Sequence, residues 1–359
     1  MQHIEVYREP GRFAGWPANY GIWSWGDEIV VGFTVGYFAP VKGFHARDSR
    51  RPFQTMQART LDGGLTWQVE PTPCRTPGGR ALSADEHMAP GLGLRVGEVL
   101  DQPGALLDPP GGIDFTYPDL ALMCARSGLE AGARSWFYVS QDRCASWQGP
   151  YRLPLFDLPG LAARTNYLVM SSQKCLFFLT ATKLDGSEGR PFCLTTEDGG
   201  RTFDFVSWIE RNPAGMAIMP SAVRLTKTSL LVAVRVHKPA ACSIDTYISE
   251  DNGETWHYYN RPVADTGRGG NPPAMIRLAD GRLCLTYGYR KPPYGIRAKI
   301  SPDGGASWGE EIILRADGGN HDLGYPCTVQ RADGKIVTVY YYNDKPDGER
   351  YIAATIWSA

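Results

Sequence analysis

Two arginines, Arg235 and Arg290, stand at the ends of two similar segments, LLVAVRVH (230–237) and LCLTYGYR (283–290). Each segment is a short apolar run with the length of a buried strand. A guanidinium group donates hydrogen bonds in a planar fork that matches the two oxygens of a carboxylate. If the two strands lie side by side, these arginines predict a binding site for a ligand that carries a carboxylate.

Smaller polar residues accompany the arginines. Asn19, Asp119 and Asn271 stand close to the starts of strand-like segments, and His237 ends the first arginine segment. Amide, carboxyl and imidazole groups both donate and accept hydrogen bonds, as sugar hydroxyls require. Together with the arginines they predict a polar pocket for an acidic sugar.

A repeated octamer identifies the elements that position these residues. Its pattern is Ser/Thr-x-Asp-x-Gly-x-Ser/Thr-Trp, in which the Asp accepts backbone N–H bonds, the Gly takes a positive φ and the aromatic ring covers the turn. The copies are TLDGGLTW (60–67), SQDRCASW (140–147), TEDGGRTF (196–203), SEDNGETW (249–256) and SPDGGASW (301–308). Each copy lies between two strand-like segments, so the octamer is a turn between strands.

The spacing of the copies predicts the fold. Their Asp residues recur about 50 to 80 residues apart, which fits four strands per repeat, and a second hairpin accompanies each copy, with a sixth near TYPDLALMCA (116–125). The sequence therefore predicts a single all-β domain over 1–359, a six-bladed β-propeller of four-stranded antiparallel blades. HIEVY (3–7) is expected to close the ring as the outer strand of the last blade, and 71–113 is expected to be an inserted loop.

Chain order also predicts which face carries the site. The octamer turns and the turns of the inner hairpins share one face and are short. The opposite face collects the starts of first strands, the ends of second strands and the long loops. Binding residues concentrate on such loops, so the site is expected on the face opposite the octamers.

The octamers, known as Asp boxes, and the six-bladed arrangement resemble the sialidase superfamily over essentially the whole chain. The resemblance implies an exo-glycoside hydrolase with three arginines on the carboxylate of its sugar. Arg235 and Arg290 match the second and third arginines, whereas the position of the first reads Gly15-Trp16-Pro17. Arg12, or else Arg8, is expected to reach that place from the preceding loop.

The resemblance also implies two catalytic residues. Tyr325, in DLGYPCTV, is similar to the family's nucleophilic tyrosine, and Asp48 is similar to its acid/base aspartate. The family's glutamate, which takes the proton of the tyrosine, is replaced here by Met219. Asp322, His321 and Asp119 are the alternative bases, because an ordinary phenol is a poor nucleophile at neutral pH.

Three functions remain open at this stage. The first is an exo-glycoside hydrolase for a terminal sialic, ulosonic or uronic acid. The second is a lyase for uronate polysaccharides, in which Tyr325 and His321 or His237 remove a proton beside a carboxylate that arginine neutralises. The third is a sugar-binding propeller without catalysis.

Composition restricts the partners. The 359 residues carry 37 Lys and Arg against 38 Asp and Glu, which disfavours nucleic acid as a ligand. No apolar run is long enough to span a membrane, and the first ten residues have no apolar signal core, so we expect a cytoplasmic protein. The eight cysteines are scattered singly, and neither a metal nor a cofactor is predicted. Whether the 71–113 insertion forms a contact between copies of the chain in a homo-oligomer is left open by the sequence.

Overall fold

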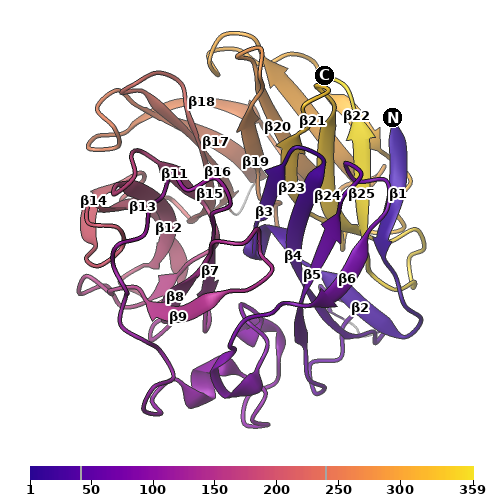
Figure 1. The fold of residues 1–359 in the computed structure, drawn as a ribbon. Coiled ribbons are helices and arrows are strands. Elements are labelled where there is room, and N and C mark those ends of the chain that lie inside the picture. The colour runs from indigo at the N-terminus through magenta and orange to yellow at the C-terminus, as the bar shows by residue number, and fades with distance from the viewer. Residues whose placement is uncertain (41–42, 239–240) are drawn as a thin grey trace.

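The computed structural model describes residues 1–40, 43–238 and 241–359, and these residues form six antiparallel sheets. The sheets are arranged as the blades of a ring (Figure 1). Six clusters of buried hydrophobic side chains lie between them, one for each pair of neighbouring blades. The prediction of an all-β six-bladed propeller is confirmed.

The chain ends meet in one blade. Blade 6 contains, from the axis outwards, β23 (Gly324–Gln330), β24 (Ile336–Tyr342), β25 (Tyr351–Trp357) and β1 (Gln2–Tyr7). The N-terminal strand thus pairs with the C-terminal strand, His3 opposite Thr355, and closes the ring as predicted. In a closed ring every blade packs against a neighbour on both of its sides.

Four other blades follow the same order from the axis outwards. Blade 1 contains β2 (Arg12–Gly15) and β3 (Ile22–Trp25), separated by the 3₁₀ turn η1 (Pro17–Asn19), then β4 (Glu28–Tyr37), β5 (Gln54–Thr60) and β6 (Gln68–Pro71). Blade 3 contains β10 (Leu161–Ala162) and β11 (Tyr167–Val169), then β12 (Cys175–Thr182), β13 (Glu188–Thr196) and β14 (Asp204–Trp208). Blade 4 contains β15 (Met216–Arg224), β16 (Leu230–Lys238), β17 (Ala241–Ser249) and β18 (His257–Val263). Blade 5 contains β19 (Ala274–Arg277), β20 (Leu283–Tyr289), β21 (Gly295–Ser301) and β22 (Ile312–Arg315).

Blade 2 departs from the predicted four strands. It consists of β7 (Ala121–Arg126), β8 (Ser135–Ser140) and β9 (Gln148–Arg152) only, so β7 is the innermost strand present. Because the Asp box follows β8, β7 corresponds to the second strand of the other blades. The segment at 116–125 was expected to supply a first strand, and that expectation is wrong.

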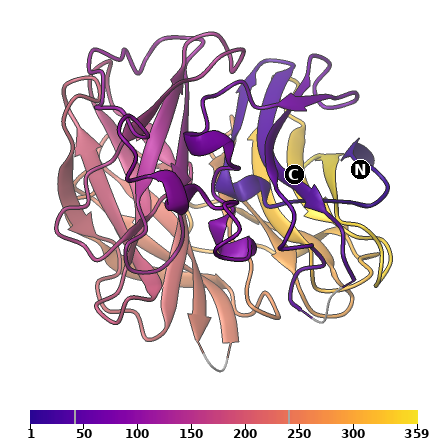
Figure 2. The same cartoon turned by 90° about the horizontal axis from the view of Figure 1, so that it is seen from below.

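The 71–113 insertion fills the space that the missing strand leaves. Its turns are η2 (Pro77–Gly79), η3 (Asp85–His87) and η4 (Val96–Val99), and Figure 2 shows them between blades 1 and 2. Leu82 is fully buried and packs with Tyr20 and Trp136 of those two blades. Its N–H donates to Thr55 Oγ1 at 2.8 Å, while Ser83 Oγ accepts from the N–H of Arg126 at 3.3 Å. The insertion is thus part of the ring and not only a surface loop.

The Asp boxes have the predicted turn structure. In the first box Asp62 accepts from the backbone N–H groups of Leu65 and Thr66, both at 2.9 Å, and from Thr66 Oγ1 at 2.6 Å. The indole of Trp67 donates to Gly64 O at 3.0 Å and closes the turn from below. These bonds to the carboxylate lower the pKa of Asp62. The equivalent bonds in the third box lower the pKa of Asp198 to about 2. The boxes stabilise the turns and lie far from the candidate site.

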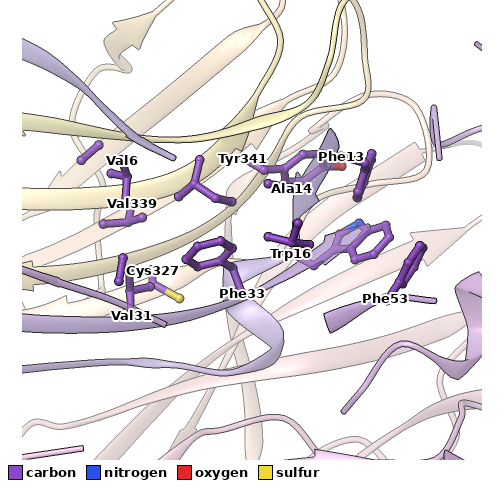
Figure 3. Close-up of a cluster of buried hydrophobic side chains, with 14 of the residues drawn as sticks. Val6, Phe13, Ala14, Trp16, Val31, Phe33, Phe53, Cys327, Val339 and Tyr341 are labelled. Carbon is purple, nitrogen blue, oxygen red and sulfur yellow. The ribbon is translucent and has the colours of Figure 1, made fainter. Parts of the chain in front are cut away.

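Large aromatic side chains pack between blades 6 and 1. Trp16, Phe13 and Phe33 of blade 1 lie with Tyr341 and Val339 of blade 6 in one cluster, drawn in Figure 3. All five are fully buried. Tyr325, a predicted site residue, packs against this cluster.

The eight cysteines are all unpaired, and seven are buried. None of the helices within the described ranges has the length and apolarity needed to cross a membrane.

The packing of the insertion can be tested by truncation. Leu82→Ala removes a fully buried side chain and should lower the free energy of unfolding by about 2–5 kcal/mol. Leu92→Ala, in the same insertion but 46% exposed, is the matched control and should change it by less than about 0.5 kcal/mol. Chemical denaturation of both variants measures the difference, and equal stabilities would contradict a structural role for the insertion.

Candidate functional site

Three innermost strands are interrupted by the same local conformation. Trp16, Met219 and Tyr325 have φ of 60°, 55° and 52°, and each is followed by proline. A left-handed conformation is costly for residues with a side chain, and proline donates no N–H to the ladder. The pairing register shifts at two of these points, between Ile218 and Ser221 and between Gly324 and Cys327. The three side chains therefore do not follow the ordinary alternation of a strand.

Asn271 holds the backbone of Tyr325 in this conformation. Its Oδ1 accepts from the N–H of Tyr325 at 2.9 Å and from the N–H of Gly288 at 3.1 Å. Its Nδ2 donates to Leu323 O at 3.1 Å, and the side chain is fully buried. Asn271 was predicted to bind substrate, but the structure commits its amide to the protein, where it fixes the position of Tyr325.

Tyr325 lies among arginines. Arg235 Nη1 donates to the Tyr325 hydroxyl at 3.0 Å, and the guanidinium carbon of Arg290 is 5.6 Å from the centre of the tyrosine ring. Burial alone would raise the pKa of Tyr325, but the charges of Arg235, Arg290 and Arg164 outweigh it and lower that pKa below its ordinary value. The structure brings together the predicted Tyr325, Arg235 and Arg290.

Arg290 is largely occupied by the protein itself. Its Nε donates to Leu323 O at 2.9 Å, its Nη1 to Gly270 O at 2.8 Å and its Nη2 to the hydroxyl of Tyr341 at 2.8 Å. Arg235 Nη1 donates to the Tyr325 hydroxyl and its Nη2 to Gly269 O, but its buried Nε has no partner among the described residues. Arg290 thus supplies positive charge and rigidity, while Arg235 keeps hydrogen-bonding capacity.

Two further buried arginines belong to the site and were missed in the sequence. Arg164 precedes β11 and pairs with Glu188, and Arg126 ends β7 and pairs with Glu86 of the insertion. Arg126 Nε and Nη1 and Arg164 Nε are buried without a partner in the described parts of the chain. Arg126 stands at the end of a second strand, as Arg235 does. It would have been found had β7 been placed second in its blade.

Two loops cover the arginines. The ring of His87, from the insertion, stacks on Trp16 with centroids 3.6 Å apart and an angle of 9°. His45, from the loop after β4, packs against Trp16 at 5.1 Å and against His87 at 5.2 Å, both edge to face. Phe44 lies over Arg290 with the guanidinium carbon 5.1 Å from the ring centre. Burial lowers the pKa of both histidines, so they are neutral at neutral pH.

Asp322 anchors one of these loops. Its carboxylate is fully buried and accepts from His45 Nδ1 at 2.6 Å, from the N–H of Ala46 at 3.0 Å, from the hydroxyl of Tyr341 at 2.9 Å and from Arg350 Nε at 2.9 Å. Burial alone would raise the pKa of Asp322, but these donors lower it and keep the carboxylate ionised. Asp322 is thus part of the site, though it does not contact Tyr325 directly.

A family profile for the BNR repeat-like domain matches residues 120–339, more than half of the chain. The chain belongs to this BNR repeat-like family. No curated protein sequence matches it.

Solved structures resemble the BNR propeller over nearly all of its length. A protein of unknown function from Dyadobacter fermentans is 22% identical, with a TM-score of 0.72 and coverage of 99% of this chain and 97% of that one. A Hadza microbial sialidase is 14% identical with a TM-score of 0.64, covering 96% of this chain and 66% of the sialidase. An α-L-arabinofuranosidase of Fusarium graminearum is 12% identical with a TM-score of 0.62, covering 100% and 98%. At these identities the likeness establishes the propeller fold.

The two arginines expected to complete a triad lie elsewhere in the BNR propeller. The guanidinium carbon of Arg12 is 4.2 Å from the ring centre of Tyr37. Arg8 pairs with Asp344 at 2.8 Å and stacks on Tyr351. Neither contacts Tyr325, because the strand interruption puts Trp16 rather than a basic residue at the equivalent place. Arg164 and Arg126 provide the additional positive charge instead.

Two predicted carboxylates are bonded to groups other than Tyr325. Asp119 pairs with Arg143 of the second Asp box at 2.6 Å, so it lies on the opposite face of the ring, a consequence of the missing first strand in blade 2. Asp48 Oδ1 accepts from the N–H of Arg50 at 2.9 Å, and its own N–H donates to Tyr37 O at 2.8 Å. Asp48 is therefore engaged within its own loop.

The remaining predicted residues border the site. Asn19 is buried in η1, with an Oδ1 that meets no donor from the described residues. His237 lies on β16 two residues beyond Arg235, partly buried, and burial followed by the charge of Arg235 lowers its pKa. His321 packs edge to face on Phe44 at 4.9 Å, and burial lowers its pKa to about 4. Over residues 1–40, 43–238 and 241–359, no cluster of three metal-ligating side chains occurs.

The electrostatic effect of the arginines on Tyr325 can be measured. Arg235→Met removes a hydrogen bond and a positive charge that favour the phenolate, so the pKa of Tyr325 should rise above its value in the unmodified protein. Tyrosinate absorbance during pH titration, with the Tyr325→Phe variant subtracted, reports this group. Arg282→Met is the control, since Arg282 is an exposed arginine paired with Asp280. An unchanged titration in Arg235→Met would contradict the interaction.

Proposed function

We propose that this BNR propeller is a sialidase-like exo-glycoside hydrolase that releases a terminal acidic sugar, a sialic acid or a related ulosonic or uronic acid. The observation that carries the proposal is the group of buried arginine N–H groups without partners. These belong to Arg126, Arg164 and Arg235, whose charges act on Tyr325 or on the neighbouring His87. Buried donors without partners are costly unless a ligand satisfies them, and a carboxylate is the anion that a sugar can bring.

Tyr325 is the proposed nucleophile. Its hydroxyl is held by Arg235, and nearby positive charge favours the phenolate, which is the nucleophilic form. Because Met219 replaces a glutamate, the arginines would perform by charge what a base performs by proton removal. The sulfur of Met219 lies 3.8 Å from Arg235 Nη1, beside the same hydroxyl.

The covered shape of the site favours action at a chain end. The rings of Phe44, His45 and His87 close the face above Trp16 and Arg290. A site covered in this way would admit one terminal sugar more readily than the middle of a polymer. The structural likeness to a sialidase and to an arabinofuranosidase supports a carbohydrate ligand, although it does not identify the sugar.

A uronate lyase is the second candidate, and one observation favours it. No described carboxylate hydrogen-bonds Tyr325, whereas His45 and His87, whose pKa values burial lowers, both pack on Trp16 in the same group of residues. In a lyase the arginines would neutralise the uronate carboxylate, a neutral histidine would remove the adjacent proton and Tyr325 would protonate the leaving oxygen. The two reactions use one pocket and differ in their products.

Product analysis decides between the candidates. Incubation with sialyl-lactose, an aryl glucuronide and a uronate polymer should release a free acidic sugar without a rise in ultraviolet absorbance if the enzyme is a hydrolase. A lyase forms an unsaturated product, which absorbs. Tyr325→Phe should abolish turnover by either route. Binding of an acidic sugar without turnover would instead indicate a non-catalytic propeller and contradict the proposal.

The role of the arginine fork can be tested separately. Arg235→Lys keeps the charge but loses the planar donor pair, so kcat/KM should fall by about 10- to 100-fold, chiefly through KM. Arg282→Lys, a matched change on the opposite face, should leave kcat/KM unchanged. Equal kcat/KM in both variants would show that Arg235 does not bind the carboxylate.

A further inference from the structure

His45 and Asp322 form a buried hydrogen-bonded pair that the proposed hydrolase does not yet use. His45 Nδ1 lies 2.6 Å from Asp322 Oδ1, and the ionised carboxylate can only accept, so Nδ1 carries the hydrogen. Asp322 is itself fixed by Tyr341, Arg350 and the backbone of Ala46. The imidazole is therefore held in one tautomer, with Nε2 as a hydrogen-bond acceptor.

The surroundings of His45 limit what Nε2 can meet. Aromatic rings pack against the imidazole from three directions: Phe44 at 4.8 Å, Trp16 at 5.1 Å and His87 at 5.2 Å. No residue in the described ranges bonds Nε2. An oriented histidine whose outer nitrogen has no protein partner is the arrangement by which a carboxylate prepares a catalytic base.

Arg290 is a neighbour common to His45 and Tyr325. Its guanidinium carbon lies near the ring of Tyr325 and near that of Phe44, the residue before His45, and its charge acts on both His45 and Tyr325. Tyr341 also joins them, because its ring packs on Tyr325 at 6.0 Å while its hydroxyl donates to Asp322. A nucleophile and an acid/base group that act on one glycosidic bond must stand on opposite sides of a sugar, separated rather than in contact.

We propose that His45, oriented by Asp322, is the general acid/base residue of the site, in the role that the sequence suggested for Asp48. The proposal rests on the proposed hydrolase function. His45 would be the catalytic residue and Asp322 a positioning residue. Asp48, three residues further along the same loop, is engaged by the N–H of Arg50.

The proton balance follows from the resting pair. In the active enzyme the pair Tyr325 and His45 carries one titratable proton in total. In the reactive form this proton is on His45, and Tyr325 is a phenolate stabilised by arginine. The phenolate oxygen then bonds to the anomeric carbon while the bond from that carbon to the aglycone oxygen breaks, and His45 Nε2 gives its proton to that oxygen. In the second step water attacks the anomeric carbon, Nε2 takes a proton from the water, and the bond to Tyr325 breaks. The shared proton is restored.

The pH dependence has a definite sign. Burial lowers the pKa of His45, and so do the charges of Arg290 and Arg47, whereas Asp322 raises it. A charge on His45 also acts against a charge on the neighbouring His87. Activity should fall on the acid side, where both members of the pair are protonated, and on the alkaline side, where neither is. Asp322→Asn removes the charge that favours the imidazolium, so the acid limb should move to lower pH.

The decisive experiment compares leaving groups. A para-nitrophenyl aglycone departs without a proton, whereas a methyl aglycone needs one, so both glycosides of N-acetylneuraminic acid and of glucuronic acid are assayed. His45→Gln should lower kcat/KM on the methyl glycoside by about 10²–10⁴-fold but spare the para-nitrophenyl glycoside, with loss of the alkaline limb. His257→Gln, an exposed histidine on β18, is the matched control and should change neither.

Each other outcome overturns a named statement. Turnover by the unmodified enzyme that His45→Gln retains on both glycosides contradicts the role of His45 alone. Selective loss of the methyl glycoside in Asp48→Asn, with His45→Gln unaffected, returns that role to Asp48. Equal losses on both glycosides in His45→Gln would mean a structural role. Absence of turnover by the unmodified enzyme on every substrate contradicts the hydrolase function itself.

Discussion

The pairing of β1 with β25 is the constraint on which the rest of the molecule depends. It makes the first residues of the chain the outer strand of the last blade, so the six sheets share one closed set of interfaces. Each blade buries hydrophobic side chains on both sides, and the inner strands are brought to the axis from six directions. The innermost strand of each blade has no further strand to pair with on its axis-facing edge. The backbone N–H and C=O groups on that edge must therefore be satisfied by side chains.

This requirement explains the chemistry of the axis. Asn271 bonds three backbone groups, Arg290 bonds two carbonyls and a hydroxyl, and Asp322 collects four donors. Arginines outnumber carboxylates around Tyr325, so the balance is positive even though the whole chain carries a net charge of −1. A buried group of like charges is stable only with compensating partners, and here those partners are incomplete. Under the proposed function, the same deficit that costs stability would favour the binding of an anion.

The sequence predicted the parts of the fold that depend on local patterns. Asp-box turns are specified within eight residues, so the five boxes together with the hairpins between them gave six blades, and the register of second strands located Arg235 and Arg290. Arg126 was missed because blade 2 lacks the expected first strand, so β7 was not recognised as a second strand. Arg164 lies in the break between β10 and β11 of blade 3, which no local pattern in the sequence reveals. His45 and His87 reach the site from irregular loops, whose path depends on tertiary packing against Trp16 and Asp322. No periodicity in the sequence reports such contacts.

The three residues with positive φ share one backbone conformation but carry side chains of different chemistry. Trp16, Met219 and Tyr325 occupy one conformation in three blades, each followed by proline, yet one offers a stacking surface, one a soft apolar side chain and one a phenol. The strain is tolerated because the surrounding ladders and Asn271 hold the chain in place. A substitution at such a position changes the group presented near the axis without changing the strand that carries it. Met219, at the position where the resemblance to sialidases implies a glutamate, is then compatible with an intact ring, and under our proposal the proton transfer passes to His45 from another blade.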